Sequence, residues 1–247
     1  MTLIDNTRSW AMTMKLDKLP LPVNQRLGRR TVKAVRLLAV FQLAILAVGF
    51  WATSHAKGRD TSGRSRSEFE AKINYCQDCH GPSGQGYRGF YPIPRLAGQQ
   101  IEYLKNQLQA FVEHRRTNNI MFNVSHTLSP AMFNALATRF REFDPRPIGG
   151  APKNLVPEGQ RIFENGVPEA NVAACAACHG PEATGRDQFP RLAGQLNTYV
   201  IKTLSNWGQE RGQNPAKPDT SAVMLPVAHS LTRAQIEAVA AYVSTLR

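Results

Sequence analysis

A short cysteine motif occurs twice in this chain, and each copy is followed by the same series of further motifs. Cys76-Gln-Asp-Cys79-His80-Gly81-Pro82 corresponds to Cys175-Ala-Ala-Cys178-His179-Gly180-Pro181, and the hexapeptide Pro-Arg-Leu-Ala-Gly-Gln follows both unchanged, at 94–99 and 190–195. Further along, Met121, His126 and Leu128 have counterparts at Met224, His229 and Leu231, each 103 residues later. Blocks that recur in one order indicate a duplicated structural unit. The chain is therefore expected to contain two similar modules.

Each module is expected to be small and all-helical. After each hexapeptide, apolar residues recur at spacings of three and four, which places them on one face of a helix. They are Ile101, Leu104, Leu108 and Phe111 in the first copy and Val200, Leu204 and Trp207 in the second. A second helix closes each copy, after the capping pair Ser129-Pro130 and after Thr232, which forms a capping-box pattern with Gln235. Alternating patterns typical of strands are absent from the sequence.

A break rich in proline and glycine separates the two modules, because a helix does not cross such a stretch. Its residues are Pro145, Pro147, Gly149, Gly150, Pro152 and Pro157. We therefore assign residues 68–144 to module 1, residues 145–157 to a linker and residues 158–247 to module 2. A chain of 247 residues has room for two modules that each bury a core.

The first 67 residues combine a basic region, an apolar run and a tether. Residues 1–36 hold eight Lys and Arg against two Asp, residues 37–54 contain an uncharged run of 16 residues, and residues 55–67 are rich in Gly, Ser and Arg. Basic residues stay on the cytoplasmic side of a membrane, so the chain after the run is expected to be exported to the periplasmic side. The run lies between a signal-peptide core, at most about 15 residues, and a spanning helix of about 17–25. We expect a retained transmembrane helix with Trp51 at the interface, and cleavage at Ser54-His55-Ala56 is the alternative.

The motif Cys-x-x-Cys-His predicts covalent attachment of haem. Its thiols lie about one helical turn apart, so both can bond the vinyl groups on one edge of the macrocycle, while the adjacent histidine points at the iron. Two disulfides do not explain why all four cysteines fall in copies of one motif. A thioredoxin-like dithiol needs a strand-to-helix context, and a zinc site needs four converging ligands. We predict two covalently bound haem c groups, one at Cys76 and Cys79 and one at Cys175 and Cys178.

Each haem iron needs two axial ligands or one open position, and this choice separates a carrier from a catalyst. His80 and His179 supply the first ligand in the motif itself. Module 2 contains a single methionine after its motif, Met224, and the duplication matches it with Met121. Met121 and Met224 are the predicted second ligands, because a methionine thioether goes with high-potential carriers.

Three other side chains compete for this role. His126 and His229 are also matched between the copies, and bis-histidine ligation would lower the reduction potential. Met132 has no counterpart and falls in an apolar helical stripe, so it is expected to fill the core of module 1.

The repeated hexapeptide has a structural and a functional interpretation. As structure, its proline ends a loop and its glycine permits the turn into the next helix. As function, the carbonyls of Pro94 and Pro190 accept hydrogen bonds from the two motif histidines, and Arg95 and Arg191 pair with haem propionates. The spacing permits both interpretations.

The net charge of +12 raises the question of a nucleic-acid partner. Half of that charge lies in the first 56 residues, and four haem propionates would leave the rest only mildly basic. No basic stripe alternates with aromatic residues, so nucleic acid is not an expected partner.

Two Cys-x-x-Cys-His-Gly-Pro modules, each followed by this hexapeptide and then by Met-x4-His-x-Leu before a final helix, resemble the cytochrome c4 family of dihaem cytochromes over residues 68–247. The resemblance implies two tandem class I cytochrome c domains with thioether bonds at the four cysteines, His80 and His179 as proximal ligands, and Met121 and Met224 as distal ligands. It also implies a periplasmic electron carrier that accepts electrons from a quinol-oxidising complex or a small redox protein and delivers them to a terminal oxidase. The long N-terminal segment departs from a freely diffusing member of that family.

Two other functions remain open at this stage. The apolar segment also suits a cytochrome subunit permanently bound to an oxidase or dehydrogenase complex. A dihaem enzyme needs an open iron position or a nearby catalytic group, which is less consistent with a methionine at both sites.

Overall fold

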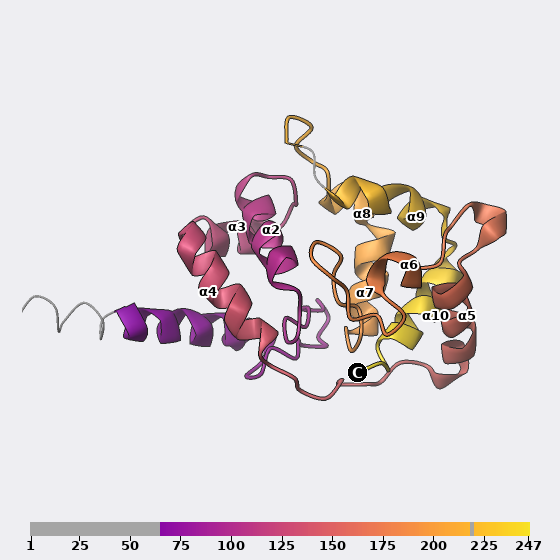
Figure 1. The fold of residues 1–247 in the computed structure, drawn as a ribbon, viewed down its shortest axis with the longest axis horizontal. Coiled ribbons are helices and arrows are strands. Elements are labelled where there is room, and N and C mark those ends of the chain that lie inside the picture. The colour runs from indigo at the N-terminus through magenta and orange to yellow at the C-terminus, as the bar shows by residue number, and fades with distance from the viewer. Residues whose placement is uncertain (1–64, 218–219) are drawn as a thin grey trace, which may run out of the picture. The chain divides into compact units, whose positions relative to one another are not determined.

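The computed structural model describes residues 65–217 and 220–247 (Figure 1). The predictions for the basic region 1–36, the apolar segment 37–54 and residues 55–64 of the tether lie outside these residues. Within the described ranges, no helix is both long enough and apolar enough to cross a membrane. Residues 65–67, predicted as the end of the tether, already belong to the first helix, because each residue added to an existing helix gains a backbone hydrogen bond.

Module 1 is built from a helix at residues 65–80 followed by α2 (Ile101–Val112), α3 (Asn119–Ser125) and α4 (Pro130–Arg141). The apolar faces of these helices form a core whose buried members are Ile73, Leu104, Leu136, Ala137 and Phe140. The predicted cap of α4 is confirmed, since the Ser129 side chain accepts the N–H of Met132 at 3.2 Å and Pro130 occupies the first turn. Met132 packs against the core, as predicted.

Module 2 follows the same order of elements with additional short helices. Its α-helices are α5 (Val156–Asn165), α6 (Ala176–His179), α7 (Asn197–Ser205), α8 (Trp207–Glu210), α9 (Met224–Ser230) and α10 (Arg233–Val243). Three 3₁₀ turns accompany them, η1 (Lys153–Leu155), η2 (Pro168–Ala170) and η3 (Thr220–Val223). The predicted capping box between Thr232 and Gln235 is present at the start of α10.

The described ranges contain no strand, only isolated bridges such as that between Tyr87 and Ile93. The predicted all-α class is therefore confirmed. No α-helix lies between residues 142 and 155, where the linker was expected. Helix α5 nevertheless begins at Val156, inside the predicted linker, because Pro157 stands in its first turn, where the missing N–H has no helical partner to lose.

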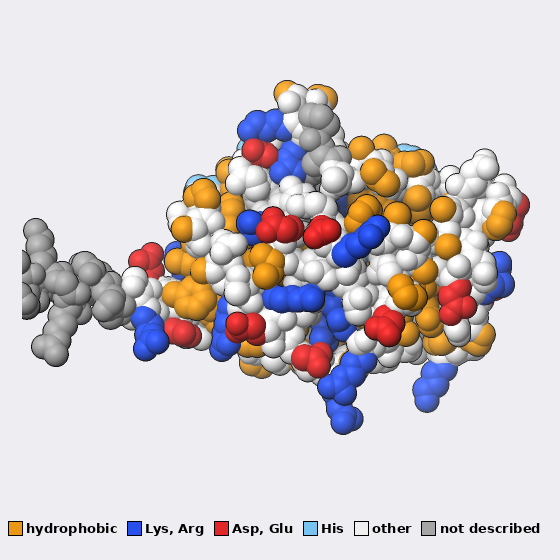
Figure 2. All heavy atoms as spheres, in the orientation of Figure 1, with side chains coloured by type: hydrophobic (Ala, Val, Ile, Leu, Met, Phe, Trp, Pro, Cys, Tyr) orange, Lys and Arg blue, Asp and Glu red, His pale blue; other side chains and the backbone are white. Residues whose placement is uncertain are grey.

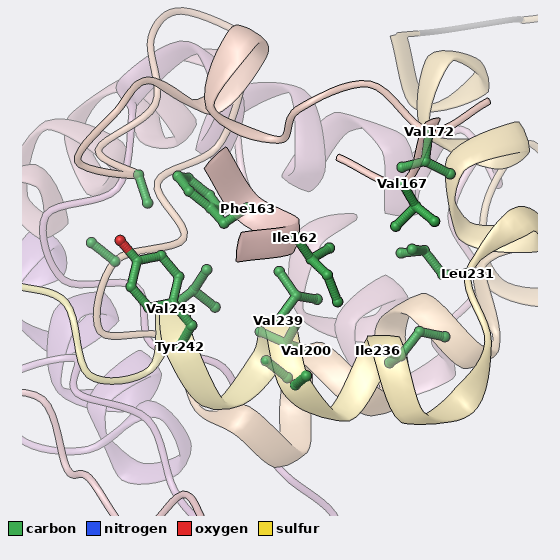
Figure 3. Close-up of a cluster of buried hydrophobic side chains, with 14 residues drawn as sticks. Ile162, Phe163, Val167, Val172, Val200, Leu231, Ile236, Val239, Tyr242 and Val243 are labelled. Atoms are coloured by element: carbon green, nitrogen blue, oxygen red, sulfur yellow. The ribbon is translucent and has the colours of Figure 1, made fainter. Parts of the chain in front are cut away.

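The core of module 2 centres on the crossing of α5 and α10 (Figure 3). Ile162 and Phe163 of α5 are fully buried, and the Phe163 ring lies 5.5 Å from that of Tyr242. The two helices approach closely at Gly159, where an added Cβ would lie 2.0 Å from the carbonyl oxygen of Ala238. The glycine therefore sets how closely the two helices pack.

The two modules belong to one compact unit. The segment after α2 pairs with the segment after α8. The N–H of Thr117 donates to the carbonyl of Glu210 at 2.8 Å, and the N–H of Gly212 donates to that of Arg115 at 2.8 Å. Figure 2 shows acidic and basic side chains interspersed on the visible face. Backbone hydrogen bonds thus join the two modules at these segments.

We expect Gly159→Ala to lower the free energy of unfolding by about 1–3 kcal/mol, because the new methyl group overpacks the crossing of α5 and α10. Helix propensity alone would change the stability by about 1 kcal/mol in the opposite direction. Denaturant unfolding of the purified protein distinguishes the two. Gln160→Ala, on the exposed side of the same helix, is the control and is expected to change stability by less than about 0.5 kcal/mol. A Gly159→Ala protein at least as stable as the unmodified one would contradict this account of the crossing.

Candidate functional site

Both cysteine motifs lie at the end of a helix. Cys76, Cys79 and His80 occupy the last turn of the helix at residues 65–80, and Cys178 and His179 end the short helix α6. The next residue, Gly81 or Gly180, has a φ of +84° or +80°, which reverses the chain at no steric cost. The two motifs therefore have the same local geometry.

None of the four cysteines is paired in a disulfide. Burial raises the pKa of Cys76 to about 11 and that of Cys175 to about 11. The thiolate is the species that exchanges disulfides, so these protonated thiols do not suit a thioredoxin-like dithiol. Within the described part of the chain, no three His, Cys, Asp or Glu side chains converge to hold a metal ion.

The two motif histidines are buried, with 7% and 5% of the His80 and His179 surfaces exposed. Nδ1 of His80 lies 2.8 Å from the carbonyl oxygen of Pro94, and Nδ1 of His179 lies 2.9 Å from that of Pro190. The proline-carbonyl contact proposed from the sequence is therefore confirmed in both modules.

This contact determines where each imidazole holds its proton. A carbonyl oxygen only accepts, so Nδ1 carries the hydrogen and Nε2 presents a lone pair. Burial lowers the pKa of His80 and of His179, which keeps both rings neutral. Each ring is thus fixed in the tautomer and charge state that binds iron through Nε2.

The matched methionines occupy equivalent helices. Met121 lies in the first turn of α3, where its N–H donates to the side-chain oxygen of Asn118 at 2.9 Å, and Met224 is the first residue of α9. Both side chains are partly exposed.

The competing histidines lie in a different environment from the motif histidines. His126 is exposed, its Nδ1 lies 3.0 Å from the carbonyl of Phe122 one turn earlier, and its ring stacks on Phe122. His229 is also exposed and lies beside Gly208 of α8. Neither is buried as His80 and His179 are, and this favours methionine as the second ligand.

The arginines of the hexapeptide bond to protein groups. The Arg95 side chain is buried and donates to the carbonyls of Ala97 and Pro145 at 3.1 and 2.8 Å, with Asp144 at 3.8 Å. Burial, with a smaller contribution from Arg191, lowers the pKa of Arg95 to about 10. Nε of Arg191 donates to the carbonyl of Ala193 at 3.1 Å. The predicted propionate contacts stay a prediction, and the structure adds a role for Arg95 in joining module 1 to the start of the linker.

The sequence did not single out the last residue of each hexapeptide. Gln195 crosses to module 1, where Oε1 accepts the N–H of Arg95 at 2.8 Å and Nε2 donates to the Arg95 carbonyl at 3.1 Å. Gln99 makes the equivalent pair of bonds to module 2: its Oε1 accepts the N–H of Arg191 at 2.7 Å, and its Nε2 donates to the Arg191 carbonyl at 3.0 Å. A two-fold interface is self-complementary, so identity of the hexapeptides over every letter was the signal that these residues meet.

These two sites fit haem c. Each offers two cysteines that form no disulfide, about one helical turn apart, and a neutral imidazole with Nε2 available, and the predicted methionine lies on a later helix of the same module. This is the donor set that covalent, histidine- and methionine-ligated haem requires.

Comparison with known proteins points the same way. The Cytochrome c family matches this chain twice, at residues 70–144 and 156–247. The chain is 37% identical to the cytochrome c4 of Thiocapsa roseopersicina, over 72% of this chain and 90% of that protein. It is 33% identical to a thiosulfate dehydrogenase electron acceptor of Thiomonas intermedia, over 87% and 93% of the two chains. The solved cytochrome c4 of Acidithiobacillus ferrooxidans superposes with a TM-score of 0.59 at 36% identity, covering 69% of this chain and 98% of that one.

We expect Met121→Ala and Met224→Ala each to remove about half of the near-infrared absorption that marks methionine bound to ferric haem, because each module supplies one such ligand. Met132→Ala is the matched control and leaves the absorption intact, since Met132 packs in the core. Loss of the absorption in His126→Ala or His229→Ala, or its persistence in both methionine variants, would contradict the assignment.

Proposed function

Because this chain belongs to the cytochrome c family, in its cytochrome c4 branch, and carries two covalently bound haem c groups for electron transfer, we propose that it is an electron carrier on the periplasmic side of the cytoplasmic membrane. It accepts electrons from a quinol-oxidising complex or a small redox protein and passes them towards a terminal oxidase. Cys76, Cys79, Cys175 and Cys178 hold the haems, His80 and His179 are the proximal ligands, and Met121 and Met224 are the distal ligands.

One observation carries this proposal: in both modules the motif histidine is buried and bonded through Nδ1 to a proline carbonyl, beside two cysteines that form no disulfide. When bound, haem c supplies reversible one-electron chemistry at iron. The chain's own residues keep that chemistry to electron transfer. A buried histidine held by a proline carbonyl would bind the iron from one side. A methionine from α3 or α9 would bind it from the other and leave no position for a substrate.

The Thiomonas relative suggests a second candidate donor. It is named as the electron acceptor of thiosulfate dehydrogenase and aligns with most of this chain. A thiosulfate-oxidising enzyme is therefore a candidate donor here as well. The carrier role is the same for either donor, because the donor affects only the surface at which electrons enter.

The apolar run within residues 37–54 supports a location at the membrane. The basic residues before it keep the N-terminus cytoplasmic and place the two modules on the periplasmic side. A retained segment holds the carrier near membrane complexes, and cleavage at Ser54-His55-Ala56 would release it to diffuse in the periplasm. Permanent assembly with an oxidase or dehydrogenase differs from the carrier role in lifetime of binding rather than in chemistry.

We expect the purified protein to take up two electrons per chain in a reductive titration, because each module holds one redox centre. It should not turn over peroxide or thiosulfate unless a partner protein is added. Met121→Ala and Met224→Ala, which open one site each, serve as positive controls for peroxide reactivity. Turnover of either compound by the unmodified protein alone would establish an enzyme and overturn the proposal.

We expect mass spectrometry of protein taken from the membrane fraction to show a chain that begins before Leu37 and carries two haems. A chain that begins at Lys57 would contradict the anchor and leave the carrier role in place. A single haem would contradict both the dihaem assignment and the carrier mechanism.

A further inference from the structure

A single peptide group links each motif histidine to the other module. The carbonyl of Pro94, which accepts the Nδ1–H of His80, belongs to the same peptide unit as the N–H of Arg95, which donates to Oε1 of Gln195. In the other direction, the peptide unit between Pro190 and Arg191 joins His179 to Oε1 of Gln99. Each histidine of one module is therefore two hydrogen bonds away from a glutamine of the other.

Both glutamine amides are held in one orientation. Oε1 of Gln195 also accepts the N–H of Leu196 at 3.1 Å, and Oε1 of Gln99 also accepts the N–H of Gln100 at 2.9 Å. Rotating either amide by 180° would place its NH₂ group against two N–H donors and its oxygen against a carbonyl. With only 5% and 7% of the Gln99 and Gln195 surfaces exposed, water cannot readily replace these bonds.

Hydrogen bonds in such a chain polarise one another, by about 10–30% per bond in a low-dielectric interior. Accepting the N–H of a peptide unit makes its carbonyl a better acceptor. A stronger bond from Nδ1–H to that carbonyl makes the imidazole a more basic ligand. A more basic ligand stabilises ferric over ferrous iron and so lowers the reduction potential.

We propose that Gln99 and Gln195 are positioning residues that act across the module boundary: Gln195 strengthens His80 as a ligand, and Gln99 strengthens His179. The proposal rests on the ligand roles proposed above for the two histidines. The contact between the modules is then part of both redox sites, and any movement that separates the two hexapeptides raises both potentials together.

The test replaces each glutamine with methionine, which keeps the length of the side chain and removes its hydrogen bonds. Gln195→Met is expected to raise the potential of the haem at His80 and to leave that of the haem at His179 nearly unchanged. Gln99→Met is expected to do the reverse. The two potentials are assigned with Met121→His and Met224→His, since a second histidine ligand lowers the potential of the substituted site alone.

Gln100→Met is the matched control. Gln100 also crosses the boundary, where Nε2 donates to the carbonyls of Thr184 and Gly185 at 2.8 and 2.9 Å, but it bonds to neither proline–arginine peptide unit. Its loss weakens the same interface without touching the route to either histidine. Both potentials should therefore stay close to those of the unmodified protein.

The outcomes separate the crossed effect from simple loosening of the interface. The proposal would be overturned by equal shifts in the two reduction potentials, or by a larger shift at the haem of the glutamine's own module. A shift of the same size in Gln100→Met would also overturn it. If the near-infrared methionine absorption persists and neither potential moves, the ligand assignment stands and the crossed effect is disproved. If that absorption is missing from the unmodified protein, the proposed function itself fails.

Amide hydrogen exchange in the unmodified protein tests the same contacts without any substitution, and it decides the question if a variant does not fold. The N–H groups of Arg95 and Arg191 should exchange far more slowly than those of exposed loops, because each is bonded to a buried glutamine. Exchange at the rate of an exposed loop would show that the hydrogen bonds to Gln195 and Gln99 are not formed and would overturn the proposal.

Discussion

The hydrogen bond from a buried imidazole to a proline carbonyl determines the chemistry of each site. A buried histidine without a partner would pay the full cost of desolvating its ring nitrogen, about 1–3 kcal/mol, and either nitrogen could hold the proton. The carbonyl of Pro94 or Pro190 removes that choice. The local sequence supplies what this bond needs: a helix that ends at the histidine, a glycine that reverses the chain, and a proline that brings a carbonyl back to the ring.

The two modules keep this bond although the loops that close it differ in length. The histidine and the proline are 14 residues apart in module 1 and 11 apart in module 2. The longer loop of module 1 carries exposed aromatic side chains, Tyr87, Phe90 and Tyr91, that have no counterpart in module 2. The hexapeptide does not vary, because a self-complementary contact requires the same residues on both sides. The contact between the modules therefore fixes the hexapeptide, whereas the loop before it can differ in length and side chains between the two modules.

Much of the fold and part of the site could be predicted from the sequence, for reasons that particular residues make plain. The closing helices could be located from pattern alone, because their caps at Ser129 and Thr232 and their apolar faces depend only on residues close in sequence. The pairing of His80 with Pro94 could be proposed because both belong to one repeated unit. Pattern did not show that Pro157 begins a helix rather than preceding one, since a proline breaks a helix only beyond its first turn. It also did not show directly that Gln99 bonds to Arg191, because that contact depends on how the two modules meet, and the identity of the two hexapeptides was its only sequence signal. The predicted membrane segment lies among residues 1–64, outside the described residues, and stays a prediction from composition.

The central claim is that each module closes its iron site with one methionine opposite a carbonyl-bound histidine. Proton NMR of the fully reduced protein tests this most directly, because a methyl group held over a haem face is shifted far upfield of every other signal. The account predicts two such three-proton signals, one from Met121 and one from Met224. One signal or none would contradict it.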